Sequence, residues 1–170
     1  ISAILCSADD DLLLVSRKGQ SVRFHSDDAT LRPMARATQG VIGMKFRGSD
    51  ELLAMDVARE DAFVVTVTDG GFGKRTSVSE WTPKGRGILG VKAMRLASDE
   101  RGSLVGAIVA HEGDEMHELR LVVNNRLGLH ARPAARFVGA LAGIEARGFI
   151  LGGAIADRLG NQQGTSASQS

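Results

Sequence analysis

The chain contains an internal repeat, and this feature limits its fold more than any other. Residues 12–24 pair with residues 63–76, and residues 36–44 pair with residues 86–94 at an offset of 50 residues. Both copies place an apolar run before a Gly-bearing turn and bases, then a linking stretch with Pro. Next comes the motif Arg-x-x-x-Gly-Val, which leads into a run that ends on Met. A short acidic turn and a last apolar run complete each copy. Such a repeat indicates one supersecondary unit per copy.

Each copy is expected to form four short β-strands. Residues 12–16 and 62–68 are short runs rich in branched residues and bounded by Asp and Gly, a pattern typical of strands. Residues 52–57 and 104–109 close the two copies in the same manner. Four strands in about 50 residues is the spacing of a propeller blade. The periodicity alone fits an antiparallel meander without propeller closure equally well.

The turns and the alternation support the β interpretation. Residues 17–20 and 68–71 supply glycines for the positive φ angles that a tight hairpin needs. In residues 21–24 the alternation places Val22 and Phe24 inward and Arg23 outward. We therefore expect a mostly β fold of two four-stranded, β-propeller-type blades, at residues 1–58 and 59–110, followed by a short α/β appendage.

Charge is segregated along the chain although the formal net charge is only +1. Residues 29–49 hold four bases and no acid, and residues 70–98 hold six bases against Glu80 alone. A pattern of this kind can build a basic stripe on a nearly neutral body, which suits a polyanionic partner. Ordinary solvated loops are the alternative reading.

Composition excludes several classes of protein. The single cysteine, Cys6, cannot form an intramolecular disulfide or a cysteine metal cluster, which suits a cytoplasmic location. No run approaches the roughly 18 apolar residues of a membrane span, and no signal peptide is visible. Because the chain opens at Ile1 in an apolar run, we expect it to be a piece of a longer protein.

Residues 9–24 and 31–44 resemble a blade opening in the C-terminal DNA-wrapping domain of the A subunit of bacterial DNA gyrase, and residues 70–76 and 84–91 resemble the next blade. The resemblance runs from about residue 4 to about residue 110. It implies a six-bladed propeller whose basic outer rim wraps double-stranded DNA within a type II, ATP-dependent topoisomerase. Implied partners are other gyrase regions and the B subunit of gyrase. The chain has no Tyr, so the strand-cleaving tyrosine of such enzymes is absent and no catalytic site is expected.

The resemblance also implies which side chains contact DNA phosphates. Residues 84–90 are similar to the Gly-rich basic box of this domain, where glycines would let the backbone approach DNA, although Ile88 and Leu89 depart from the family form. A dinucleotide loop is excluded because no strand–helix context follows. The candidate DNA-binding bases follow the strand turns: Arg23, Arg32, Arg36, Lys45, Arg47, Lys74, Arg75, Lys84, Arg86 and Lys92.

Beyond residue 110 the sequence changes character. Residues 119–138 resemble the opening of the histidine phosphocarrier protein of the bacterial sugar phosphotransferase system, which implies His130 as phosphoacceptor with Arg132 beside it. With Pro133 early in a helix, His130 is expected at a helix N-terminus, where a phosphate is favoured. Residues 142–160 resemble a strand–loop–helix unit of adenine phosphoribosyltransferase without its substrate loop, and a packing helix is the favoured reading.

The expected organisation is a phosphocarrier-like strand and helix at 111–141, a transferase-like piece at 142–160 and a disordered tail at 161–170. The predicted function is non-sequence-specific binding and wrapping of duplex DNA, with no cofactor, metal or membrane. Two alternatives stay open. One is phosphoryl transfer through His130, and the other is a composite fragment without function.

Overall fold

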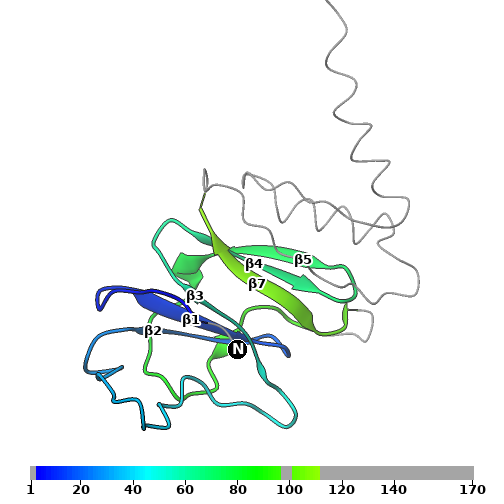
Figure 1. Cartoon of the computed structure of the whole chain (residues 1–170). Coiled ribbons are helices and arrows are strands. Elements are labelled where there is room, and N and C mark those ends of the chain that lie inside the picture. The colour runs from blue at the N-terminus through cyan, green and yellow to red at the C-terminus, as the bar shows by residue number, and fades with distance from the viewer. Residues whose placement is uncertain (1–2, 97–100, 112–170) are drawn as a thin grey trace, which may run out of the picture.

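The computed structural model describes residues 3–96 and 101–111, and within these ranges the chain folds into antiparallel β-sheets (Figure 1). One four-stranded sheet has the order β3-β1-β2-β6 and one three-stranded sheet has the order β5-β4-β7. The predicted mostly β, antiparallel fold is confirmed. The elements are β1 (Asp11–Ser16), β2 (Gln20–His25), β3 (Leu52–Val57), β4 (Phe63–Thr68), β5 (Gly73–Ser77), the short 3-10 helix η1 (Val78–Glu80), β6 (Val91–Lys92) and β7 (Leu104–Ala110).

The two hairpins, β1–β2 and β4–β5, repeat one local design. Gly19 and Gly71 have φ angles of 80° and 79°, and their N–H groups donate to the carbonyls of Ser16 and Thr68, each at 3.0 Å. The positive φ of each glycine closes a tight turn without steric conflict, because glycine has no Cβ. Both turns lie where the sequence predicts them, and Ser16 and Gly19 of the first copy thereby correspond to Thr68 and Gly71 of the second.

Strand β6 does not join the hairpin of its own copy. Val91 and Lys92 pair instead with Ser21 and Gln20 of β2, so the first sheet crosses the predicted boundary between residues 58 and 59. The N–H of Ala93 extends this pairing by donating to the Gly19 carbonyl at 2.9 Å. The two copies are therefore joined by a shared sheet, a pairing between distant residues that the repeat pattern alone does not specify.

In the first copy the run that ends on Met44 forms no strand. Met44 makes only an isolated parallel bridge with Ile88, and Lys45 N–H donates to the Ile88 carbonyl at 2.8 Å. The expected strand is missing because, among the described residues, no strand edge lies beside residues 41–42 as β2 lies beside β6. A strand is defined by its neighbour as much as by its own sequence.

Two apolar clusters cover the two faces of the first sheet. One lies between the sheets and includes Leu13 of β1, Val64 of β4, Leu104 of β7 and Trp81. The other lies on the opposite face of the first sheet, where Phe24 of β2 clusters with Met44 of the long connection between β2 and β3. Both faces of the first sheet are thus covered, and every residue of β1 is buried. Figure 1 shows the two sheets stacked, with that connection beneath β2.

Within the described ranges, the structure has no helix of the length and apolarity that crossing a membrane requires. In the same part of the chain no three His, Cys, Asp or Glu residues gather in a way that would hold a metal ion. The predicted appendage beyond residue 111, with His130 and Arg132, and the predicted tail at 161–170 lie outside the described residues.

Candidate nucleic-acid interface

Four basic side chains of the second copy line one open hollow of about 540 Å³. Lys74 lies on β5, Lys92 on β6, Arg95 follows β6 and Arg101 precedes β7. Phe72, Gly73 and Met94 complete the described lining, which contains no acidic residue. The hollow therefore concentrates positive charge at the place where the strand β6 of the first sheet approaches the hairpin of the second.

Backbone carbonyls orient two of these cations. Lys74 Nζ donates to the Ala93 carbonyl at 3.2 Å, and an Arg101 guanidinium nitrogen donates to the Arg95 carbonyl at 2.9 Å. The Arg101 guanidinium carbon also lies 5.6 Å from the centroid of the Phe72 ring. An ammonium has three donors and a guanidinium five, so each contact leaves donors that a phosphate oxygen can accept.

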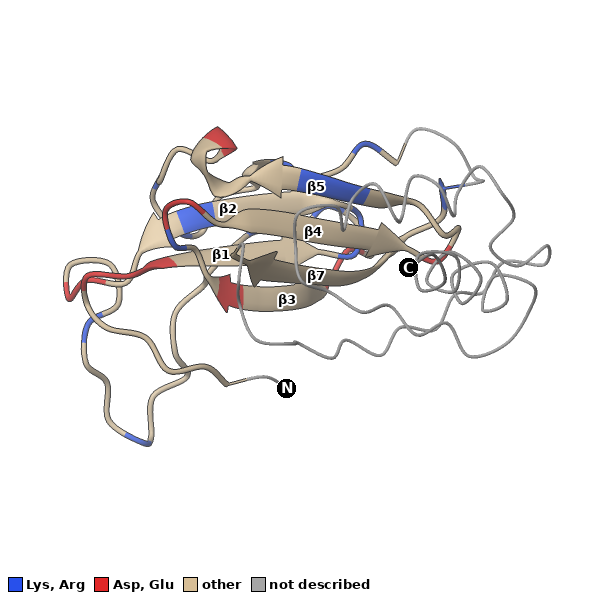
Figure 2. Ribbon diagram, turned by 90° about the horizontal axis from the view of Figure 1, so that it is seen from above, with Lys and Arg blue, Asp and Glu red and all other residues tan. Residues whose placement is uncertain are grey.

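Other predicted bases lie elsewhere on the surface. Arg32, Arg36, Lys45 and Arg47 are exposed along the connection between β2 and β3, and Lys84 is exposed after η1. Figure 2 shows basic positions of this connection away from the blue stretch of β5. Of the predicted set, the structure brings only Lys74 and Lys92 into the hollow.

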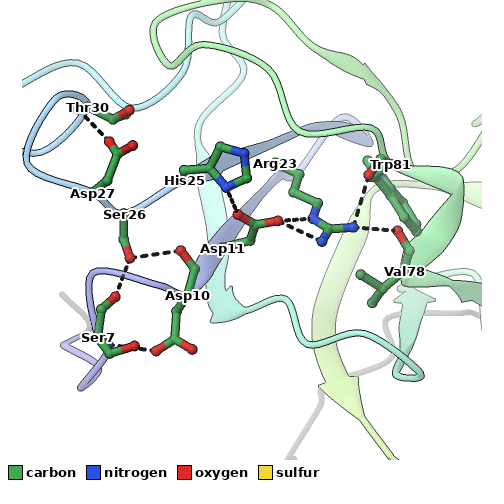
Figure 3. Close-up of polar contacts among 10 residues, drawn as sticks. All are labelled: Ser7, Asp10, Asp11, Arg23, His25, Ser26, Asp27, Thr30, Val78 and Trp81. Carbon is green, nitrogen blue, oxygen red and sulfur yellow. Dashed lines mark hydrogen bonds and ion pairs between the residues drawn. The ribbon is translucent and has the colours of Figure 1, made fainter.

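Hydrogen bonds anchor the start of this base-carrying connection (Figure 3). The Ser26 hydroxyl lies 2.5 Å from the Ser7 carbonyl and 2.8 Å from the Asp10 carbonyl. The Asp27 carboxylate accepts from the Thr30 N–H at 2.8 Å, and hydrogen bonding by Thr30 lowers the pKa of Asp27 below its ordinary value. The connection thus leaves β2 in a defined direction.

Arg86 and Arg75 make contacts within the protein. Arg86 Nε donates to the Thr30 carbonyl at 2.8 Å, and its Nη1 donates to the Ile42 carbonyl at 3.2 Å, which ties the connection to the second copy. The Arg75 guanidinium carbon lies 4.7 Å from the centroid of the Phe63 ring. Both residues are half-buried, whereas Lys74 and Lys92 are exposed, so less of each arginine is accessible to a binding partner.

Arg23 has a structural role, because protein covers the outward face on which its side chain lies. Its side chain is 10% exposed, and its Nε and Nη2 each lie 2.6 Å from Asp11 Oδ2 (Figure 3). Its Nη1 donates to the carbonyls of Val78 and Trp81 at 3.3 and 3.1 Å. Alternation does place Arg23 opposite the buried Val22 and Phe24, but that second face meets η1 and its neighbours instead of water.

Glycines of the Gly-rich segment 84–90 make close contacts within the protein. A Cβ on Gly90 would lie 1.9 Å from the Ser21 carbonyl oxygen, so this glycine allows the two backbones to meet. Gly87 N–H donates to the Gly43 carbonyl at 2.6 Å. At these two positions the neighbouring backbone is that of the first copy, whereas the expected close approach to DNA stays a prediction.

Sequence reasoning did not select Arg95 and Arg101 as binding residues. Both lie in the connection from β6 to β7, away from the strand turns after which the candidate bases were expected. Their proximity to Lys74 depends on the pairing of β6 with β2. Arg95 is one of the six bases in the acid-poor segment 70–98, but its neighbours in the sequence do not distinguish it from an ordinary surface residue.

Comparison with protein families extends to the part of the chain beyond the described residues. Residues 117–156 match the family model described as the phosphorylation site of the HPr component of the phosphotransferase system. This match supports the resemblance at residues 119–138. It also continues past residue 141 into the segment that resembles the transferase.

Solved structures resemble the described fold. The structure of a DNA gyrase A C-terminal domain superposes with a TM-score of 0.57 and 31% identity over 63% of this chain and 36% of that one. The C-terminal domain of DNA topoisomerase IV superposes with a TM-score of 0.58 over 64% of this chain and 33% of that one. The identity to the second is 23%, so this likeness concerns the fold alone.

The sequence comparisons agree with the structural ones. The A subunit of DNA gyrase from Streptomyces coelicolor is 59% identical over 121 residues, or 71% of this chain. That from a Nocardioides species is 43% identical in an alignment 169 positions long that covers 80% of this chain. The chain spans only 14% and 18% of these relatives. Residues 10–59 and 62–111 each match the family model described as the DNA gyrase C-terminal domain, beta-propeller. The chain therefore belongs to the DNA gyrase C-terminal domain family.

Proposed function

We propose that this chain binds duplex DNA without sequence selection and bends it along its surface, as part of a gyrase A subunit. One observation carries the proposal: Lys74, Lys92, Arg95 and Arg101 line a single hollow that has no described acidic residue. Membership of the gyrase C-terminal domain family supports it. The corresponding partners are double-stranded DNA, the remaining gyrase regions and the B subunit of gyrase, in the cytoplasm.

The physical basis of such binding is electrostatic. Each Lys or Arg that neutralises a phosphate releases condensed counterions, and this gain does not depend on base sequence. Bending a duplex of 20–30 base pairs costs on the order of 1–6 kcal/mol, which several phosphate contacts offset. A stiff β scaffold with bases at fixed positions suits this task because it needs no rearrangement on binding.

The proposed interface has a centre and a periphery. The centre is the hollow with its four bases, and Arg95 and Arg101 enter the proposal from the structure. The periphery consists of exposed bases that the sequence predicted: Arg32, Arg36, Lys45, Arg47 and Lys84. Arg75 and Arg86 are half-buried outside the hollow and contribute at most part of their donors, and the half-buried Arg101 likewise offers only part of its donors to the hollow. Arg23 is left out because Asp11 and two carbonyls hold it.

Two variants with equal loss of charge test the proposal. In the first, the exposed hollow residues Lys74, Lys92 and Arg95 become Ala, and in the second, Arg17, Lys18 and Arg59 become Ala. Duplex affinity is measured by fluorescence anisotropy at one salt concentration, and circular dichroism verifies folding. We expect about a tenfold or larger loss for the first variant and a much smaller loss for the second. Equal affinities of the two folded variants would refute an interface centred on the hollow.

A second candidate function is phosphoryl acceptance by His130. The observation that favours it is the match of residues 117–156 to the HPr phosphorylation-site model. Incubation with phosphoenolpyruvate and the phosphotransferase enzyme should place acid-labile phosphate on His130, and His130→Ala should abolish the label. Label that persists in His130→Ala, or no label in the wild-type chain, would rule this function out.

A further inference from the structure

The hairpin turn of the first copy holds both described ends of the connection that carries Arg95 and Arg101. The Gly19 carbonyl accepts from the N–H of Ala93, which directly follows β6, at 2.9 Å. The Arg17 carbonyl accepts from the N–H of the first residue of β7 at 2.8 Å. One turn of the first copy therefore fixes the backbone ahead of one base of the hollow and behind the other.

Gly19 brings this turn into direct contact with the connection. Its φ angle is 80°, and a Cβ at this position would lie 2.6 Å from the Met94 carbonyl oxygen and 3.7 Å from the side chain of Leu96. Met94 lines the hollow, and Arg95 is the next residue along the chain. The backbone that carries Arg95 therefore rests on the turn so closely that only a glycine fits there.

A buried carboxylate fixes the turn itself. Asp50 is 9% exposed, and its Oδ2 accepts from the Ser16 hydroxyl at 2.6 Å. Its Oδ1 accepts from the N–H groups of Lys18 and Glu51, each at 2.9 Å. The Ser16 hydroxyl in turn accepts from the Gln20 N–H at 3.0 Å. Because hydrogen bonds to a carboxylate are stronger than those between neutral groups, Asp50 ties both sides of the turn to the bend that precedes β3.

The second copy also keeps a carboxylate between its turn and the bend before its last strand. The bend before β7 corresponds to the bend before β3, and Gly102 takes the place of Asp50 there. The Asp69 side chain of the turn fills this space, since a Cβ on Gly102 would lie 1.6 Å from Asp69 Oδ1. That oxygen accepts from the Ser103 N–H at 2.9 Å. The two copies thus place the acid on opposite sides of the same joint.

We propose that Asp50 is a positioning residue for the basic hollow. It does not belong to the described lining, and it acts through the turn whose carbonyls hold the connection with Arg95 and Arg101. The inference rests on the proposed DNA binding and deepens it, because it says what keeps two of the bases in place. Cations on a fixed backbone lose less conformational freedom on binding than cations on a loose one, so a fixed turn favours binding.

The sign of the effect separates positioning from electrostatics. Removing a negative charge from the chain strengthens its attraction for a polyanion if charge alone matters. Positioning predicts the reverse for Asp50. In Asp50→Asn an NH₂ group replaces one carboxylate oxygen, so either the Ser16 hydroxyl or the N–H groups of Lys18 and Glu51 face a donor in place of an acceptor. The turn then loses part of its anchor while the chain becomes more basic.

Asp50→Asn and Glu51→Gln in the full 170-residue chain test the proposal. Both remove one negative charge, at neighbouring positions, but the Glu51 side chain is 67% exposed and pairs with Arg17 at the surface. Duplex affinity, measured by fluorescence anisotropy at one salt concentration, should fall about fivefold for Asp50→Asn and stay equal or rise for Glu51→Gln. Circular dichroism verifies folding. A folded Asp50→Asn chain that binds as tightly as Glu51→Gln would overturn the proposal.

A second pair of variants tests the turn without changing the charge. Gly19→Ala presses a methyl group against the Met94 carbonyl, whereas Gly48→Ala places one in open space, and both glycines have positive φ. The affinity should fall about fivefold for Gly19→Ala and change little for Gly48→Ala. This pair decides the question if Asp50→Asn does not fold. Equal affinities of the two folded glycine variants would contradict the role of the turn.

A double-mutant cycle shows whether Asp50 acts through the hollow. Asp50→Asn is combined with the replacement of Lys74, Lys92 and Arg95 by Ala. In this background the loss caused by Asp50→Asn should largely disappear, because the bases that the turn positions are already reduced. Additive losses would show that Asp50 acts elsewhere and would overturn the inference. Undiminished affinity of the triple Ala variant alone would instead refute DNA binding by the hollow, so the two failures are distinguishable.

Discussion

At the scale of single residues, Arg23 shows what the alternation of side chains along a strand cannot predict. Alternation predicts that Val22 and Phe24 are buried, and each is 2% exposed. The same rule puts Arg23 on the opposite face, but it cannot tell whether water or protein covers that face. Carbonyls of Val78 and Trp81, more than 50 residues away in sequence, decide this, and Asp11 balances the charge.

Replacing Arg23 should therefore destabilise the fold strongly. Arg23→Ala leaves the 7% exposed Asp11 carboxylate without the guanidinium and with His25 as its remaining ion-pair partner among the described residues. Breaking such a buried pair costs about 3–5 kcal/mol. Arg17 provides the control, because its pair with Glu51 is exposed on both sides and Arg17→Ala should cost about 1 kcal/mol or less. Urea unfolding measures both. Similar midpoints for the two variants would show that the buried pair does not stabilise the fold.

At the scale of elements, the hairpins could be predicted from sequence and the assembly of the first sheet could not. The glycine turns, the branched runs and the alternation are local, and β1, β2, β4 and β7 lie close to where these patterns predict them. The partner of β6 is a non-local choice. A hydrogen-bond chain supports that pairing, because Trp81 Nε1 donates to the Ser21 hydroxyl at 2.7 Å and that hydroxyl donates to the Val91 carbonyl at 2.9 Å.

Gly90→Ala should weaken this joint between the copies. The new methyl would press on the Ser21 carbonyl and the φ of 71° would be strained, so we expect a loss of about 2 kcal/mol or more. Gly48→Ala introduces the backbone strain in open space and should cost about 1 kcal/mol. Thermal unfolding of both variants measures the difference. If Gly90→Ala is no less stable than Gly48→Ala, the close approach of β6 to β2 is not a requirement of the fold.

At the scale of the whole molecule, the sequence indicates a basic surface without locating its centre. Counting bases in residues 70–98 finds the excess of charge, but only the folded chain brings Lys74 and Lys92 together with Arg95 and Arg101. The family resemblance identifies the repeat and its class correctly. Which bases face outward depends on the packing of two sheets, and for this reason Arg23 and Arg86 differ so much from Lys74.

The measurement that tests the central claim most directly is duplex affinity as a function of salt concentration. If about five or six phosphates are engaged, the logarithm of the affinity should fall with the logarithm of salt at a slope of about −5, or about −0.9 per phosphate. Replacing Lys74, Lys92 and Arg95 with Ala should make this slope shallower by about 2 to 3. A slope near zero for the folded wild-type chain would contradict the proposal that its basic hollow binds DNA.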